Sequence, residues 1–170
     1  MADKALLVID MQNDYLWEKR MNKFSYDTDA LVESVNTAID TYKESADIIY
    51  ISHLIQNLWT NRLLFGFSIE GTDGAKLYEK LNIVSDLQFN KYFPDAFKTK
   101  ALKELATKNQ YKEILLCGLD QCGCVYHTAL GALNCADSVF ILQNATGCRY
   151  NEKRLQKAIA ALKDKGIQFI

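Results

Sequence analysis

The sequence has few of the features that mark membrane, secreted or nucleic-acid-binding proteins. Its 170 residues include a single proline, and the formal net charge is −1. A near-neutral chain offers no strongly basic surface, so we expect neither nucleic acid nor a membrane as a partner. No apolar run approaches the roughly 18 residues that a membrane-spanning helix needs. The first residues lack the pattern of a signal peptide, and we therefore expect a cytoplasmic protein.

Histidine is also sparse, and the cysteines do not suggest a disulfide framework. Two histidines are too few for a metal site rich in imidazole. The five cysteines are odd in number, and a disulfide framework would be unusual in a chain of this length. We expect reduced thiols, which lie in the C-terminal half at Cys117, Cys122, Cys124, Cys135 and Cys148.

Short apolar runs alternate with helical patterns along the whole chain. Strands are predicted over residues 5–9, 47–51, 113–117 and 138–142, with a possible edge strand at 168–170. Helices are predicted to begin near Asp27 or Thr28, after Thr99, at Cys124 and after Asn151. Residues 76–89 are ambiguous and are interpreted as a short helix followed by one or two short strands. This alternation predicts a single domain, residues 1–170, of the three-layer α/β/α class with a doubly wound, mostly parallel, Rossmann-like sheet.

The stretch from residue 114 to 134 combines a buried strand, a tight loop and a helix. The loop runs from Gly118 to Cys124, so Cys124 lies at the first turn of the helix. In an open α/β sheet such loops open at the carboxyl ends of the strands, where ligands bind. The helix dipole and free backbone N–H groups at this point favour a thiolate.

Two further residues lie at or near the ends of other predicted strands. Asp10 follows residues 5–9, and Lys91 follows Phe89. Strand ends meet at one edge of a parallel sheet, so Asp10 could accept the thiol proton and Lys91 could stabilise the thiolate. The loop N–H groups could form an oxyanion hole. The alternatives are a turn-capping Asp10, a surface Lys91 and a cysteine that only packs.

Three segments resemble the isochorismatase-like cysteine hydrolases, which include nicotinamidases and N-carbamoylsarcosine amidohydrolases. They read LLVIDMQNDY (6–15), NKYFPDAF (90–97) and CGLDQCGCVYHTALGAL (117–133), and the resemblance covers residues 5–145. It implies the isochorismatase-like hydrolase fold and a catalytic triad of Asp10, Lys91 and Cys124. It also implies an oxyanion hole from the N–H groups of Asp120 and Cys124, and a cis peptide between Leu119 and Asp120. Tyr15 matches an aromatic residue that lines the pocket in relatives.

The chain departs from the nicotinamidase pattern after the second strand. Nicotinamidases bind a metal there through an Asp-x-His motif, whereas this chain has Leu54 and Gln56. We therefore expect no metal and no cofactor, and the departure argues against nicotinamidase itself.

The remaining pocket residues are predicted from their places in the chain. We expect His53, Trp59 and Tyr92 to join Tyr15 in the substrate pocket. Trp59, Phe65 and Phe67 belong to a long connection, where aromatic side chains could cover the pocket or pack against a neighbouring subunit. Both interpretations remain open, and we expect a homo-oligomer because relatives commonly form one.

The leading hypothesis is a cysteine hydrolase that cleaves a C–N bond in a small amide, imide or carbamoyl-type substrate through a thioester. A second hypothesis is a thiol redox or metal-binding module built from Cys117, Cys122, Cys124 and His127. Against it, Cys117 lies inside a strand and the spacing matches no usual zinc pattern. Cys122 could act as a resolving thiol, although the simpler interpretation is that it is an ordinary loop residue. A third hypothesis is a non-catalytic descendant that only binds a metabolite.

Overall fold

The computed structural model describes residues 2–170 and is built on one six-stranded sheet, with the order β3-β2-β1-β4-β5-β6. Each neighbouring pair of strands is parallel. The strands are β1 (Lys4–Ile9), β2 (Asp47–His53), β3 (Gln88–Lys91), β4 (Glu113–Gly118), β5 (Ser138–Thr146) and β6 (Gln168–Phe169). The predicted α/β class with a parallel sheet is confirmed.

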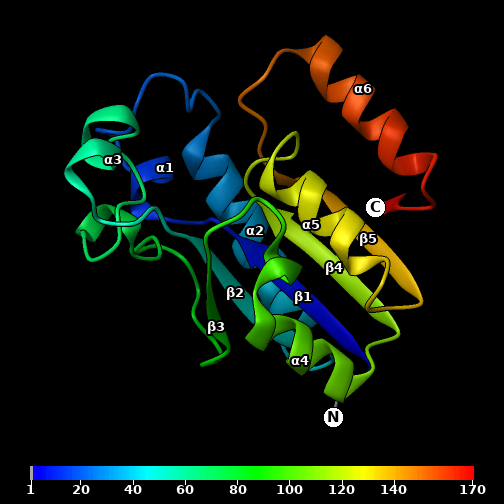
Figure 1. The fold of residues 1–170 in the computed structure, drawn as a ribbon. Helices are drawn as coiled ribbons and strands as arrows, with labels where there is room; N and C mark the ends of the chain where they lie inside the picture. Colours follow the sequence, from blue (N-terminus) through cyan, green and yellow to red (C-terminus); the bar gives the residue numbers. More distant parts are fainter. Residues whose placement is uncertain (1) are drawn as a thin grey trace.

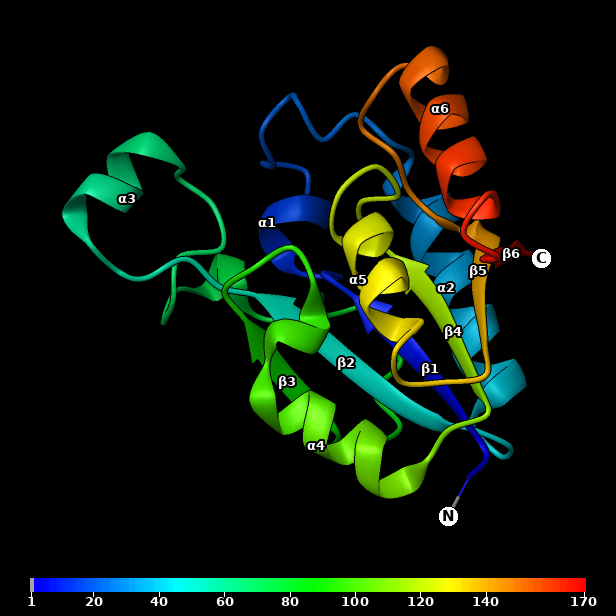
Figure 2. The same ribbon diagram turned by 45° about the vertical axis from the view of Figure 1, so that its right-hand side comes forward.

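Helices cover both faces of the sheet (Figure 1). They are α1 (Asn13–Leu16), α2 (Thr28–Tyr42), α3 (Trp59–Leu64), α4 (Lys100–Asn109), α5 (Cys124–Ala132) and α6 (Glu152–Lys163), with short 3-10 turns at Asp73–Ala75 and Ala96–Lys98. Figure 2 shows α4 and α5 on the near side of the sheet and α2 behind it. The apolar core is accordingly divided into one cluster that includes α2 and another that includes α4, α5 and α6.

The central strand β1 is buried on both faces, as its unbroken apolar run predicts. Leu6 and Val8 belong to the core on the α2 side, whereas Leu7 and Ile9 belong to the opposite core. Alternating side chains of a strand point to opposite faces, so such a strand needs apolar residues at every position.

Side-chain caps mark the starts of α2 and α6, but not those of the other four α-helices in residues 2–170. Asp27 accepts a hydrogen bond from the N–H of Ala30 at the start of α2, and Asn151 accepts one from Arg154 at the start of α6. Thr99 precedes α4 as predicted, but its hydroxyl donates to the carbonyl of Asn90 and does not cap the helix.

The connections around β3 are less regular than the strands. Within residues 76–89 only the last two residues enter a strand, and no helix forms there. The long connection after β2 contains the short helix α3, which Figure 2 shows projecting from one side of the body. None of the helices in residues 2–170 has the length and apolar character needed to cross a membrane.

Gly118 allows the end of β4 to lie directly against β1. Its φ is +101°, and a Cβ atom at this position would collide with the backbone of Ile9. The N–H of Leu119 donates to the carbonyl of Ile9 at 2.8 Å. The end of β1 and the loop after β4 are therefore held together by backbone contacts.

Candidate active site

Two strand ends and the start of α5 bring Asp10, Lys91 and Cys124 together. The ammonium of Lys91 donates to Asp10 Oδ2 at 2.9 Å and to Cys124 Sγ at 3.0 Å. The Asp10 and Lys91 residues are 3% and 1% exposed, respectively. The structure therefore assembles the three residues that the sequence predicts to meet.

Each of these side chains is placed by a regular element. Asp10 directly follows β1 with a φ of 55°, and its N–H donates to the carbonyl of Ile51 on β2. Lys91 is the last residue of β3, and Cys124 is the first residue of α5. Because all three elements belong to the packed body, the site is held by the sheet and by a helix lying on it.

Burial decides the protonation of the cysteine. It raises the pKa of Cys124 to about 12, and the charge of Asp10 adds to this effect while Lys91 opposes it. The thiol is therefore protonated near neutral pH, because burial outweighs the preference of the helix start for a thiolate. The nucleophile needs a base, and Asp10 Oδ1 is buried with no hydrogen-bond partner within residues 2–170. This oxygen is free to accept the thiol proton.

Lys91 remains a cation in this buried setting. Burial alone would lower the pKa of Lys91, but the charges of Asp10 and Cys124 and the hydrogen bonds to them raise it overall. A protonated lysine between the carboxylate and the sulfur keeps both oriented and offsets negative charge on either.

The loop before Cys124 leaves two N–H groups unused. The Leu119–Asp120 peptide is cis, as the family resemblance implies. The N–H groups of Gln121, Cys122 and Gly123 donate to acceptors within the protein. In contrast, those of Asp120 and Cys124 have no acceptor among residues 2–170. These are the two donors that the resemblance assigns to an oxyanion hole.

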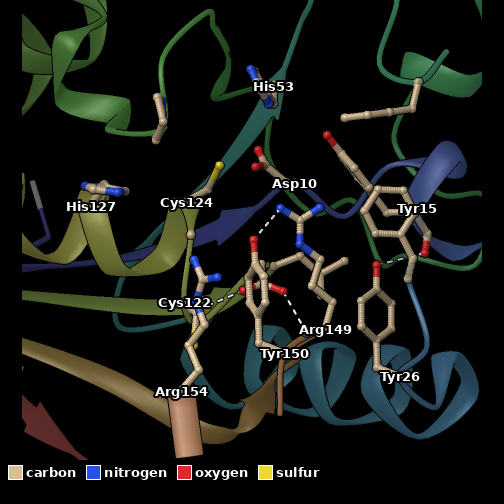
Figure 3. A pocket seen from close by; sticks show the side chains of 16 residues that line it. Asp10, Tyr15, Tyr26, His53, Cys122, Cys124, His127, Arg149, Tyr150 and Arg154 are labelled. Carbon is tan, nitrogen blue, oxygen red and sulfur yellow. Dashed lines mark hydrogen bonds between the residues drawn. The ribbon is translucent and has the colours of Figure 1, made fainter. Parts of the chain in front are cut away.

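A cavity of about 300 Å³ opens beside Cys124 (Figure 3). This size suits a small molecule. Tyr15 and His53, two of the predicted pocket residues, line it. The other lining residues are Asp10, Phe24, Tyr26, Phe67, Pro94, Leu119, Asp120, Cys122, Gly123, Cys124, His127, Arg149, Tyr150 and Arg154.

Aromatic rings form one wall of this cavity. The Tyr15 and Phe24 rings meet edge to face with centroids 4.9 Å apart, and Phe24 and Phe67 are 5.5 Å apart in the same manner. Hydroxyl groups fix the wall, since Tyr26 donates to the carbonyl of Tyr15 and Ser68 donates to the hydroxyl of Tyr15.

Two predicted pocket residues lie elsewhere. Trp59 is 76% exposed because it belongs to α3, which projects from the body. Tyr92 is 47% exposed, and its hydroxyl donates to Glu70. The prediction that Trp59 and Tyr92 line the pocket is wrong for this chain, because an irregular loop and an outward-facing side chain carry them away from it.

Sequence reasoning missed the residues that follow β5. Arg149, Tyr150 and Arg154 all line the cavity, and His127, expected to be an ordinary helix residue, does so too. Arg149 and Tyr150 could have been predicted from their position in the chain. They follow β5, which is parallel to β4 and ends at the same edge of the sheet.

The structure does not assemble the proposed redox or metal module. Cys117 is fully buried in β4, and its thiol faces the carbonyl of Leu7 at 3.7 Å. Cys122 instead lies beside Cys148, with the two sulfur atoms 3.4 Å apart and both thiols free. The prediction of a cluster that includes Cys117, Cys122, Cys124 and His127 is therefore wrong.

Possible metal ligands converge at two places in residues 2–170: Asp10, His53 and Cys124 form one group, and Asp120, Cys122 and Cys148 form the other. In the first, the Lys91 ammonium already contacts Asp10 and Cys124, so a second cation would be repelled. In the second, the carboxylate of Asp120 already accepts the N–H groups of Cys122 and Arg149. The Lys91 ammonium therefore argues against a metal ion bound beside Cys124.

Comparisons with known proteins agree with this fold. The chain matches the family model of the isochorismatase domain over residues 4–170. Curated protein sequences contain no match. Among solved structures, the pyrazinamidase of Pyrococcus horikoshii in complex with zinc is 25% identical, with a TM-score of 0.78 and coverage of 99% of this chain and 98% of that chain.

Two other solved structures are similar over almost the whole chain. The nicotinamidase of Bacillus subtilis is 22% identical, with a TM-score of 0.79 and coverage of 98% of both chains. An isochorismatase-like hydrolase from Alkaliphilus metalliredigens is 21% identical, with a TM-score of 0.81 and coverage of 99% of this chain and 93% of that chain. The common architecture therefore extends across the sheet and its helices.

Proposed function

The chain belongs to the isochorismatase family of hydrolases, and from this we propose that it cleaves a C–N bond in a small amide, imide or carbamoyl-type substrate. The observation that carries the proposal is the contact of one buried ammonium, Lys91, with both Asp10 and Cys124 beside a small cavity. An acid–base group, a nucleophile and two free N–H donors are what acyl transfer to a thiol requires. The nicotinamidase and pyrazinamidase among the similar structures are named as amidases, which supports the choice of an amide.

The proposed reaction begins with attack of Cys124 Sγ on the substrate carbonyl carbon. Since burial keeps the thiol protonated, its proton passes to Asp10 as the S–C bond forms. The carbonyl oxygen becomes an oxyanion and accepts hydrogen bonds from the N–H groups of Asp120 and Cys124. Asp10 then gives the proton to the leaving nitrogen, the C–N bond breaks, and a thioester remains on Cys124.

Hydrolysis of the thioester uses the same groups, with water as the nucleophile and the Cys124 thiolate as the leaving group. Asp10, again a carboxylate, removes a proton from water as the water oxygen attacks the thioester carbon. The second oxyanion collapses, the C–S bond breaks, and the thiolate recovers its proton from Asp10. Lys91 remains protonated throughout and balances the negative charge that moves between the carboxylate and the sulfur.

Trapping the thioester tests this proposal directly. Wild-type protein mixed with a panel of small amides, imides and N-carbamoyl compounds should release ammonia or an amine, and rapid acid quenching should leave an acyl group on the peptide that contains Cys124. Cys124→Ala should lose both signals. Cys135→Ala, a cysteine outside the cavity, should keep both.

Turnover without any adduct on Cys124, or equal turnover by Cys124→Ala, would contradict the assignment of the nucleophile. Binding of a panel member with no turnover would instead favour the non-catalytic descendant.

We also propose that α3 takes part in a homo-oligomer. Trp59, Leu63 and Leu64 are each more than 70% exposed, and α3 contributes no residue to the cavity wall. Adjacent exposed apolar side chains of this kind are typical of protein interfaces.

We propose that the protein functions in the cytoplasm. Its five cysteines are all free thiols, which is usual for proteins of a reducing compartment.

Light scattering on two variants tests the oligomer. Leu63→Asp combined with Leu64→Asp should reduce the particle mass to that of one chain. Ile83→Asp, which places the same charge at another exposed apolar position, should not. A wild-type protein that already has the mass of one chain would contradict the proposal.

A further inference from the structure

One guanidinium group in the cavity lacks the anionic partner that its position calls for. Arg149 extends into the space that Asp10 and Cys124 also line (Figure 3). Its Nε is buried and has no hydrogen-bond partner within residues 2–170, and no carboxylate in that part of the chain forms an ion pair with it. A half-buried charge with an unused donor is unfavourable unless a ligand completes it.

The protein holds this guanidinium in place by other contacts. Its Nη2 donates to the hydroxyl of Tyr150 at 2.8 Å, and the carbon of the guanidinium lies 5.6 Å from the centre of the Phe24 ring. The main-chain N–H of Arg149 donates to Asp120 Oδ2 at 2.8 Å. Since Asp120 also supplies an N–H group to the proposed oxyanion hole, Arg149 is linked to the loop at which the carbonyl would react.

Negative side chains of the cavity do not form an ion pair with Arg149. Asp10 is paired with Lys91, and both carboxylate oxygens of Asp120 accept main-chain N–H groups. The second cavity arginine, Arg154, stacks at 3.6 Å on the ring of Tyr150. The cavity therefore has an excess of positive charge on the side of Arg149.

We propose that Arg149 binds a carboxylate of the substrate, so that the substrate is a small amide that also carries a carboxylate, such as the monoamide of a short dicarboxylic acid. This inference rests on the proposed amide hydrolysis and narrows its substrate class. Nε–H and an Nη–H lie on one edge of a guanidinium and match the two oxygens of a carboxylate. A cavity of about 300 Å³ limits the chain between the carboxylate and the amide to a few atoms.

Binding to a variant that cannot turn over isolates this contact. Calorimetry on Cys124→Ala would compare oxamate, malonamate, succinamate and glutaramate with the corresponding neutral diamides, which have nearly the same shape. At one length or more, the carboxylate should bind at least about tenfold more tightly than its diamide, because charge-assisted hydrogen bonds are worth more than neutral ones. Adding Arg149→Gln should remove this preference, whereas adding Lys157→Gln, on the exposed face of α6, should preserve it.

Arg149→Lys provides a second variant that retains the charge. It should keep only part of the preference, because an ammonium cannot form the two parallel bonds of a guanidinium. A cooperative thermal unfolding transition shows that each variant is folded. If Arg149→Gln does not fold, the loss of preference is measured on Arg149→Lys alone. Equal affinity for acids and diamides at all four lengths, or a preference that survives Arg149→Gln, would overturn the proposal.

Kinetics on protein with Cys124 intact separates this inference from the proposed function. If acids bind preferentially through Arg149 but no amide is hydrolysed, the carboxylate site stands and the amidase proposal fails. If diamides and acids are hydrolysed equally and Arg149→Gln changes neither KM, the amidase proposal stands and the carboxylate site fails. With both correct, Arg149→Gln raises KM for the acids at least about tenfold and leaves KM for the diamides nearly unchanged.

Discussion

Asp10→Asn is expected to lower kcat by about 100- to 10,000-fold, the usual contribution of a general base. The amide of Asn cannot accept the thiol proton. Because burial raises the pKa of Cys124 to about 12, very little thiolate forms near neutral pH without that base. Steady-state kinetics on a substrate from the amide panel would measure the loss, and Asp164→Asn, at an exposed position after α6, should match wild type.

The pH dependence of the Asp10→Asn variant identifies the cause of its loss. Without the base, the thiolate must come from simple ionisation, so kcat/KM of the variant should rise about tenfold for each pH unit between 7 and 9, below the raised pKa of Cys124. Wild type should change much less over this range. If the variant keeps near-wild-type rates and a flat profile, Asp10 is not the base.

Lys91→Met is expected to lower the free energy of unfolding by about 3–5 kcal/mol, which is the usual effect of breaking a buried ion pair. The ammonium is almost fully buried, and its loss leaves the Asp10 carboxylate charged and without a partner in the same environment. Urea denaturation at pH 7 would measure the change. Lys98→Met, at an exposed position in the same segment, should stay within about 0.5 kcal/mol of wild type.

A double variant shows whether the unpaired charge is responsible. Asp10→Asn together with Lys91→Met removes both charges, so it should recover a large part of the stability lost by Lys91→Met alone. Equal losses in the single and the double variants would instead mean that the lysine stabilises the fold through packing of its aliphatic chain.

The strands that place Asp10 and the loop before Cys124 were predictable because they are buried. β1 and β4 are apolar on both faces, and this pattern has few structural alternatives to a central parallel strand. Once two such strands are placed, their carboxyl ends must lie together, which brings Asp10 close to the loop before Cys124. The position of these residues therefore follows from the sequence, while their catalytic roles remain proposals.

The loops were less predictable because periodicity does not describe their direction. Trp59 was expected in the pocket, but the helix that carries it projects outwards. Arg149 and Tyr150 were overlooked because the predicted strand stopped at Leu142, whereas β5 continues to Thr146 with an irregular register beside Gly118. The longer strand places the following residues at the sheet edge where the cavity opens.

The protonation of the Cys124 thiol depends on two opposing effects, of which the sequence shows only one. A helix N-terminus favours a nearby negative charge by only about 0.3–1 kcal/mol in most settings. Burial acts in the other direction, and here it dominates the pKa of Cys124. Whether a cysteine at a helix start is covered by neighbouring loops cannot be judged from the helix alone.

The cavity walls come from two separate sources, and this matters for protein engineering. Asp10 and Cys124 are positioned by backbone contacts between the end of β1 and the loop that follows β4. In contrast, Phe24, Phe67 and Arg149 belong to connections outside the sheet. A library of variants restricted to Phe67 and Arg149, which are only partly buried, would vary the shape and charge of the cavity while leaving the backbone contacts of Gly118 untouched. Phe24 is buried in the apolar core and should be kept. Directed evolution at the other two positions should therefore yield many folded variants, because these residues lie outside both the strands and the buried core.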